Sequence, residues 1–328
     1  MGTINKLYHC GIFQGEHKKK HYFEGWYFKH VDQQEENILS IIPGISYEDS
    51  RENAHAFIQI IDGSTCKTHY LRYPIEDFSF CRDRFEVCIG KNVFGQQGIS
   101  LDIEEGGVRL KGQLRYSNRI AWPTSPLSPN SMGWYGFVPL MECYHGVLSL
   151  QHEISGRLLL QEREISFEGG RGYMEKDWGT SFPSSWIWLQ SNHFDVPDTG
   201  FMLSVARIPW RGRFFTGFIA GLWHTNRIYR FATYTGAKIQ GLEHLGQHIR
   251  LTLSDKDHLL ILQGLQGDSG KLQAPQKGAM TTQIEESIRG TAEIQLISKK
   301  KDAVLLTAKA RCCGMELAGD LEELTHKA

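Results

Sequence analysis

The sequence lacks a long hydrophobic run, and none of its apolar stretches approaches the roughly 18 residues that a membrane-spanning helix needs. It also lacks an excess of charge, with 36 Lys and Arg residues against 37 Asp and Glu residues. Because phosphate contacts require a basic surplus, this balance argues against a nucleic-acid partner. No apolar stretch follows the basic cluster near the N-terminus, so no secretory signal is recognisable. We therefore expect a soluble, cytoplasmic, globular protein.

Cysteine pairs suited to metal binding are also missing. The seven cysteines are an odd number and include no C-x-x-C pair. Cys312 and Cys313 are adjacent, and in a strand their side chains would point to opposite faces, which is a poor geometry for shared metal binding. Although the chain has 14 histidines, it has no H-E-x-x-H spacing. We expect reduced thiols packed as small apolar residues, no metal and no cofactor.

Helical periodicity is scarce, whereas strand-like alternation is frequent. Between Ser100 and Tyr116, apolar and polar residues alternate on both sides of a Gly106-Gly107 turn, which is typical of a hairpin with one buried face. A short segment, Leu317–Leu324, is the one late helix candidate. The sequence therefore predicts an all-β fold. The same alternation predicts two further hairpins and three further strands: Ile249–Leu253 with Leu259–Gln263, Ala292–Ile297 with Ala303–Ala308, and Phe85–Ile89, Trp186–Asn192 and Arg227–Tyr234.

One long segment, Trp122–Pro139, breaks the alternation with four prolines and two glycines. Proline removes the N–H donors that a sheet needs, so we expect an irregular loop here. Loops of this length in a compact domain are often functional. A length of 328 residues suggests about two domains. A boundary at residue 170 gives two domains of barrel size, 1–170 and 171–328.

The first stretch with unusual chemistry is Tyr22–Lys29. In an extended backbone Tyr22, Glu24, Trp26 and Phe28 share one face, so that a carboxylate lies between aromatic rings. This is not a routine core pattern. The alternative is that Glu24 lies at a sheet edge and pairs with a Lys or Arg.

The second stretch is Gly170–Asn192. Tyr173, Glu175 and Asp177 project together if the backbone is extended, while Met174, Lys176 and Trp178 lie on the opposite face. Two carboxylates roughly 7 Å apart repel each other, so at least one should have a raised pKa if the site is dry. Raised carboxyl pKa values are what general acids at neutral pH require. Downstream, one strand face would carry an aromatic wall that ends in amides: Trp186, Trp188, Gln190 and Asn192. The alternative is a solvated turn beside a tryptophan core.

In these segments the chain resembles the tocopherol cyclase family, and the resemblance extends over most of its length. The segments that carry it are Tyr22–Lys29 (YFEGWYFK), Met132–Val147 (MGWYGFVPLMECYHGV), Tyr173–Asn192 (YMEKDWGTSFPSSWIWLQSN), Leu272–Gly290 and Glu316–Gly319. The resemblance implies two tandem lipocalin-like antiparallel β-barrels packed across a cleft. That architecture agrees with the all-β prediction, which was reached independently.

The resemblance also implies a reaction. Tocopherol cyclases close a chromanol ring by adding a phenol oxygen across the trisubstituted alkene of a prenylated hydroquinone, and a related carotenoid hydratase family adds water to such an alkene. Glu175 would be the acid, Tyr173 would orient it or relay its proton, and His145 of the Tyr-His-Gly segment would deprotonate the phenol. Asp177 departs from the pattern, which has a neutral amide here. This departure leaves open which of Glu175 and Asp177 is the acid.

A hydrophobic isoprenoid would also need an apolar binding surface. Tryptophan ring faces would stabilise a carbocation by roughly 0.5–2 kcal/mol per ring, and the loop with Trp134, Tyr135 and Phe137 is the expected point of transient contact with a membrane surface. Two other functions stay open: an isoprenoid hydratase or isomerase that uses the same acid, and a non-catalytic lipocalin-like carrier. The oligomeric state is not readable. The residues expected to bind substrate are Glu24, Trp26, Tyr27, Trp134, Tyr135, Trp178, Trp186, Trp188 and Asn192.

Overall fold

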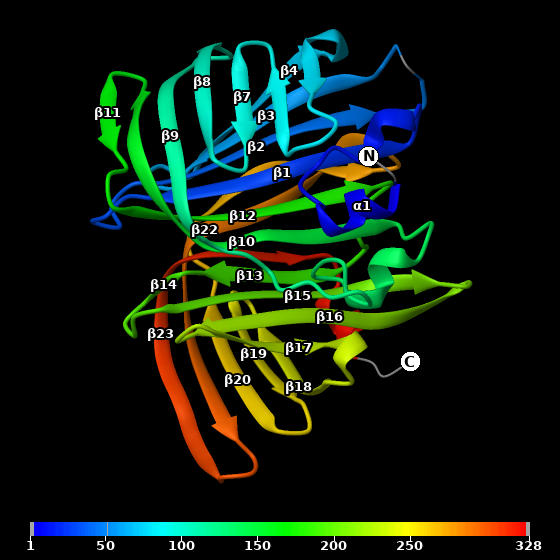
Figure 1. Ribbon diagram of the computed structural model, residues 1–328, viewed down its shortest axis with the longest axis vertical. Coiled ribbons are helices and arrows are strands. Elements are labelled where there is room, and N and C mark those ends of the chain that lie inside the picture. Colours follow the sequence, from blue (N-terminus) through cyan, green and yellow to red (C-terminus); the bar gives the residue numbers. More distant parts are fainter. Residues whose placement is uncertain (1–2, 51, 326–328) are drawn as a thin grey trace. The chain divides into compact units, whose positions relative to one another are not determined.

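The computed structural model describes residues 3–50 and 52–325 (Figure 1). The chain divides into two compact units. The first contains Met1–Phe182 and Lys271–Gln283, and the second contains Pro183–Gly270 and Ile284–Ala328. Each is built on a large antiparallel sheet, as the sequence predicted.

The first sheet has 12 strands and follows the order β4-β3-β2-β1-β12-β10-β9-β8-β7-β6-β5, with β11 paired to β10. Its edge strands β4 and β5 are neighbours in the chain and are joined by the short 3₁₀ helix η2 (Ile75–Asp77). The first strand, β1, pairs with the last, β12, so the meander curls back on itself like a barrel with one open seam. The strands are β1 Tyr22–Val31, β2 Ile38–Tyr47, β3 His55–Asp62, β4 Lys67–Pro74, β5 Phe78–Phe80, β6 Glu86–Ile89, β7 Asn92–Gly95, β8 Gly98–Glu105, β9 Val108–Ile120, β10 Cys143–Leu160, β11 Arg163–Ser166 and β12 Gly170–Gly179.

The second sheet repeats this connectivity with 11 strands, in the order β17-β16-β15-β13-β23-β22-β20-β19-β18, with β14 paired to β23 and β21 to β22. Its first strand also pairs with its last, and its edge strands β17 and β18 are joined by η4 (Thr233–Thr235). The strands are β13 Trp186–Ser191, β14 His193–Phe194, β15 Thr199–Trp210, β16 Arg213–His224, β17 Arg227–Ala232, β18 Lys238–Leu245, β19 His248–Ser254, β20 His258–Leu265, β21 Ser269–Gln276, β22 Ala279–Ser298 and β23 Ala303–Ala318.

The predicted hairpins are confirmed as β8–β9, β19–β20 and β22–β23. The helix prediction for Leu317–Leu324 is wrong for its first half, because β23 continues to Ala318 with Leu317 paired to Ile187 of β13. Only the 3₁₀ turn η5 (Leu321–Leu324) follows. The remaining helices are α1 (Thr3–Tyr8), η1 (Gly15–His17) and η3 (Gly133–Phe137), the last of which interrupts the otherwise irregular loop after β9. Within the described part of the chain, no helix has the length and apolarity to span a membrane.

Residues 171–179, which the boundary at residue 170 assigned to the second domain, lie in β12 (Gly170–Gly179) of the first sheet. This strand lies between β1 and β10 and pairs with both along most of its length. Its backbone hydrogen bonds are therefore satisfied in the first unit, whose first segment ends only at Phe182.

The side chains of β1 and of β12 alternate between the two faces of the sheet. Trp26, Phe28, Met174 and Trp178 belong to the hydrophobic core of the first unit. Successive side chains point to opposite faces of a strand, so Tyr173, Glu175 and Asp177 lie on the other side of β12. A separate core fills the second unit and is built from residues such as Leu203, Leu251 and Leu296.

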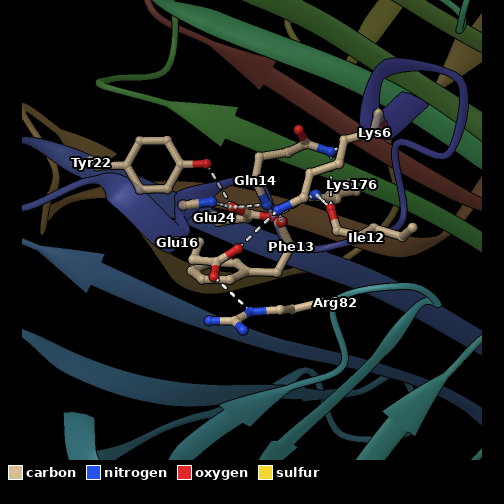
Figure 2. Close-up of polar contacts among 10 residues, drawn as sticks. Lys6, Ile12, Phe13, Gln14, Glu16, Tyr22, Glu24, Arg82 and Lys176 are labelled. Atoms are coloured by element: carbon tan, nitrogen blue, oxygen red, sulfur yellow. Dashed lines mark hydrogen bonds and ion pairs between the residues drawn. The ribbon is translucent and has the colours of Figure 1, made fainter. Parts of the chain in front are cut away.

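An ion pair lies inside the first core. Lys176 of β12 and Glu24 of β1 are both fully buried, and the distance from Lys176 Nζ to Glu24 Oε1 is 2.5 Å (Figure 2). The Tyr22 hydroxyl donates to Glu24 Oε2 at 2.5 Å. Buried charges are tolerated only when they are paired and hydrogen-bonded. The alternative from sequence, in which Glu24 pairs with a cation, is thus correct as to the pairing, although the pair is buried and not at a sheet edge.

The same ion pair holds the N-terminal segment in place. Lys176 Nζ donates to the carbonyl oxygen of Ile12 at 2.8 Å, and the backbone N–H of Gln14 donates to the Glu24 carboxylate (Figure 2). Lys176 Nζ also donates to the Cys10 carbonyl oxygen at 2.8 Å, and the Gly15 N–H donates to Glu24. The Lys176 ammonium also lies 5.0 and 4.7 Å from the ring centroids of Trp26 and Trp178. These contacts satisfy both charges and explain how they remain in the core.

Replacing Lys176 by Met should lower the free energy of unfolding by about 3–5 kcal/mol, because it leaves the Glu24 carboxylate buried without its cation. Lys111→Met is the matched control, since the ion pairs of Lys111 with Asp102 and Glu104 are exposed and should contribute less than about 1 kcal/mol. Chemical denaturation measures both values. Equal losses for the two variants would contradict the role of the buried pair.

Candidate active site

The site lies on the face of β12 that is opposite to the core. The β10–β12 register places His145 directly across from Asp177, and the β1–β12 register places Tyr27 across from Glu175. Side chains at paired positions lie on the same face. Two strands, β10 and β12, therefore bring His145, Tyr173, Glu175 and Asp177 together, and β1 adds Tyr27 beside them.

The polar atoms of this set form a continuous array. The Tyr173 hydroxyl donates to Glu175 Oε2 at 2.5 Å, and His145 Nδ1 donates to Asp177 Oδ1 at 2.9 Å. The distance from His145 Nε2 to Glu175 Oε2 is 3.7 Å, which allows charge attraction but is too long for a hydrogen bond. This Nε2 atom is buried and has no hydrogen-bond partner in the described part of the chain. The array therefore contains one hydrogen-bond donor that is available to a bound molecule.

The electrostatics of the array favour a charged imidazole. Burial lowers the pKa of His145, but the charges of Asp177 and Glu175 and the hydrogen bond to Asp177 outweigh it and raise the pKa to about 9. At neutral pH His145 is then an imidazolium. Burial, together with the charge and hydrogen bond of Glu175, raises the pKa of Tyr173 well above its usual 10. Tyr173 therefore remains a hydrogen-bond donor at every physiological pH.

Supporting contacts come from the loop before β10. The Ser131 hydroxyl donates to the His145 carbonyl oxygen at 2.9 Å, and the His145 N–H lies 3.2 Å from Met132 Sδ. These contacts fix the backbone that presents the imidazole. The sequence analysis assigned no role to Ser131, and no local pattern identifies it, because the contact depends on the path of the loop.

His145, Glu175 and Asp177 each offer one metal-ligand atom, and these atoms lie within 4.8 Å of one another. However, the two imidazole nitrogens face different carboxylates, and Nδ1 is already bonded to Asp177. A histidine ligates a metal through a single neutral nitrogen. The three side chains are therefore better placed to exchange protons with one another than to bind a metal ion.

The residues expected to bind substrate lie in four different parts of the structure. Tyr27 lies on the Glu175 face, with its ring centroid 6.4 Å from that of Tyr173 and its hydroxyl 2.9 Å from Ser40 Oγ. Glu24, Trp26 and Trp178 lie on the opposite, core side of the strands, where Trp26 donates to the Gly11 carbonyl oxygen at 2.8 Å. The structure therefore does not bring these three to the acid.

Trp134 and Tyr135 lie in the loop after β9, with their rings stacked at a centroid distance of 3.9 Å. Trp186, Trp188 and Asn192 are buried residues of the second unit. The indole N–H of Trp186 donates to Glu316 Oε2 at 2.6 Å. Trp188 and Trp186 alternate with Ile187 and Leu189, which belong to the second core, so the tryptophans lie on the side of β13 away from that core.

The fold and this array define an all-β protein with two meander sheets and a buried carboxylate–imidazolium–phenol site on one strand face. A family model described as tocopherol cyclase-like matches residues 96–319, which is more than half of the chain and includes His145, Tyr173, Glu175 and Asp177. The chain belongs to this family.

Two curated relatives carry corresponding names. "Probable tocopherol cyclase, chloroplastic" from Oryza sativa subsp. japonica is 22% identical over 239 residues, covering 66% of this chain and 51% of the relative. "Tocopherol cyclase, chloroplastic" from Zea mays is 22% identical over 200 residues, covering 58% and 42%. The chain thus spans about half the length of the curated relatives it matches.

Solved structures support the fold. The crystal structure of CghA with Sch210972 matches with a TM-score of 0.57 at 10% identity and covers 91% of this chain and 89% of that chain. Kievitone hydratase from Nectria haematococca matches with a TM-score of 0.50 at 9% identity and covers 90% and 88%. At these identities the likeness concerns the fold alone.

The raised pKa of His145 makes stability depend on pH. Because the pKa is about 9 in the folded state and 6.5 ordinarily, the stabilising imidazolium contributes fully below pH 6.5 and its contribution is lost as the pH rises through 9. Between these limits the unfolding free energy should fall by about 3 kcal/mol more in the wild type than in His145→Gln. Denaturant titrations across this pH range test it, with the exposed His244→Gln as control. Parallel curves for wild type and His145→Gln would contradict the assignment.

Proposed function

We propose that the protein catalyses acid-promoted ring closure of a prenylated hydroquinone, in the manner of a tocopherol cyclase. The observation that carries this proposal is the array of Tyr173, Glu175, His145 and Asp177 on one face of β10 and β12, in which Tyr173 and Glu175 are buried. Protonation of an alkene needs an acid held away from bulk water. Glu175 is the more buried of the two carboxyl groups, with 6% of its side chain exposed against 22% for Asp177.

In the proposed reaction Glu175 acts in its protonated form, while the Asp177 carboxylate keeps His145 charged through Nδ1. Glu175 transfers its proton to the less substituted carbon of the trisubstituted alkene. The cation that forms on the tertiary carbon is captured by the phenol oxygen, so that one C–O bond closes the ring. The phenolic proton then returns to the Glu175 carboxylate. No atom or electron is gained or lost, and the acid is regenerated.

His145 takes a different role from the one that the resemblance implied. An imidazole that is already protonated at neutral pH cannot accept the phenolic proton. Instead, its Nε2–H, which has no hydrogen-bond partner among the described residues, can donate to the substrate oxygen and position it. Asp177 keeps the imidazole charged and oriented through Nδ1. Tyr173 orients Glu175 through its 2.5 Å hydrogen bond.

A second candidate is addition of water to an isoprenoid alkene. The partial exposure of Asp177 supports it, because water can reach that end of the array and take the place of the phenol as nucleophile. The same acid would serve both reactions. A carrier without catalysis would need no such array facing its ligand.

Glu175→Gln should lower kcat for a phytyl hydroquinone by at least about 1,000-fold, because the amide keeps the shape but cannot give a proton to carbon. In D₂O the wild type should place one deuteron in the new ring CH₂, as mass spectrometry can detect. Glu164→Gln, an exposed change on β11, is the control and should leave kcat unchanged. A fully active Glu175→Gln would overturn the acid assignment, and an unchanged ligand mass with wild type would indicate a carrier.

Asp177→Asn distinguishes the two carboxyl groups. Removing the Asp177 charge should lower the pKa of His145 from about 9 toward 6.5, because that charge and its hydrogen bond raise it. We expect most of kcat to survive near pH 6, with the alkaline limb of the kcat–pH profile shifted down by one unit or more. If Asp177→Asn is inactive at every pH while Glu175→Gln is active, Asp177 is the acid.

A further inference from the structure

The loop between β9 and β10 concentrates exposed apolar surface. Among the described residues ten large apolar side chains are exposed, and four of them lie within this one loop: Leu127 (79% exposed), Trp134 (45%), Phe137 (40%) and Leu140 (96%). Single exposed apolar residues are common on protein surfaces, but several of them in one loop mark an interaction surface. We refer to these four residues as the apolar loop patch.

Hydrogen bonds and a ring contact fix the loop that carries the apolar loop patch. The Tyr8 hydroxyl donates to the Pro126 carbonyl oxygen at 2.7 Å, and the Tyr8 ring lies 6.2 Å from that of Phe137. Tyr8 thereby links the Leu127 turn to the Phe137 turn. Beneath them, the buried Asn130 side chain accepts from the Met132 N–H at 3.0 Å and donates to the Leu7 carbonyl oxygen at 3.3 Å. Polar residues anchor the loop while its apolar residues remain outside.

Leu140 is also exposed, and its backbone has an unfavourable conformation. Its φ angle is +64°, in the left-handed region that residues other than glycine, asparagine and aspartate seldom adopt. The neighbouring backbone is fixed by the Tyr144 hydroxyl, which donates to the Val138 carbonyl oxygen at 2.8 Å. A leucine in an unfavourable backbone conformation with an almost fully exposed side chain contributes no burial free energy to the stability of the fold. A partner that covers it would explain both features.

The loop also carries no charge. From Ala121 to Met141 there is no Asp, Glu, Lys or Arg. Charged groups are what make transfer into a lipid layer costly, whereas Trp and Tyr favour the interface between lipid and water. A protein-binding surface would ordinarily keep a polar, charged rim. The composition therefore fits lipid better than protein.

A cation lies at the base of the loop. Arg119 precedes the uncharged segment and lines a cavity of about 350 Å³ together with Trp122, Thr124 and Pro129. Arg119 Nη1 donates to the Leu148 carbonyl oxygen at 3.0 Å. Asp83 and Arg84 line the same cavity, but among the described residues neither Asp83 nor any other carboxylate forms an ion pair with Arg119. Its charge is thus available for an anionic headgroup at the rim of the patch.

We propose that the apolar loop patch inserts into the surface of an anionic lipid membrane, with Arg119 contacting a lipid phosphate. The proposal is independent of the reaction at Glu175. It would, however, give a protein whose described residues form no membrane-spanning helix access to a long-tailed substrate dissolved in lipid.

The test is flotation of the full-length protein with vesicles of phosphatidylcholine alone or with 30 mol% phosphatidylglycerol. The partition coefficient of the triple variant Trp134→Ser/Phe137→Ser/Leu140→Ser should be roughly 1,000-fold lower, because each of the three inserted apolar side chains contributes roughly tenfold. Arg119→Gln should remove the preference for the anionic vesicles. The matched control, Trp210→Ser/Phe214→Ser/Leu245→Ser, removes the same three exposed residue types from the second unit and should bind as the wild type does.

Two results would overturn the proposal: no vesicle binding by the wild type, or equal binding by the loop variant and its control. If instead the wild type forms a dimer in solution that the loop variant converts to monomer, the patch is a protein interface and the lipid proposal fails. Unchanged thermal melting of the loop variant excludes misfolding. Because these assays need no substrate, an active Glu175→Gln enzyme would refute the proposed function and leave this inference standing, and the reverse also holds.

Discussion

The structure of the first unit depends on a charge pair inside its core. Lys176 and Glu24 join the last strand of the sheet to the first and tie the N-terminal segment to both. The pair also determines which side of β12 faces inward. With Lys176 inside, Tyr173, Glu175 and Asp177 must lie on the other face, and a slip of one residue would place two carboxylates in an apolar core. Core and site are thus two faces of a single strand.

The side chains of the site are linked by hydrogen bonds and charge attraction. Two carboxylates, one imidazole and one phenol lie within bonding or ion-pair distance, and Asp177 and Glu175 together hold His145 in its charged form. Such coupling lets one group carry positive charge while a neighbouring carboxyl group exchanges a proton with a ligand. Membership of the tocopherol cyclase-like family is consistent with this chemistry, since its named relatives include tocopherol cyclases.

Both units share one topological device, the pairing of the first strand with the last. In the first unit this closure pairs β1 with β12, so residues far apart in the sequence, such as Tyr27 and Glu175, become cross-strand neighbours. The closure therefore adds Tyr27 to the site, whose other residues come from the paired strands β10 and β12. The uncharged loop lies just before β10, and its residues Ser131 and Met132 contact the His145 backbone. The loop that carries the surface patch therefore leads directly into the strand that carries His145.

Much of the local structure follows from the order of residues along the chain. Alternation identified the hairpins β8–β9, β19–β20 and β22–β23 and placed Tyr173, Glu175 and Asp177 on one face, because side-chain direction in a strand depends only on the period of two. It failed at Leu317, where pairing with β13 prevailed over a weak helical preference. Three further features depend on tertiary packing: Glu24 pairs with Lys176, His145 faces Asp177, and Trp26 and Trp178 belong to the core. Those facts depend on the register between distant strands and on which face is inside, and both are set by packing of the whole sheet.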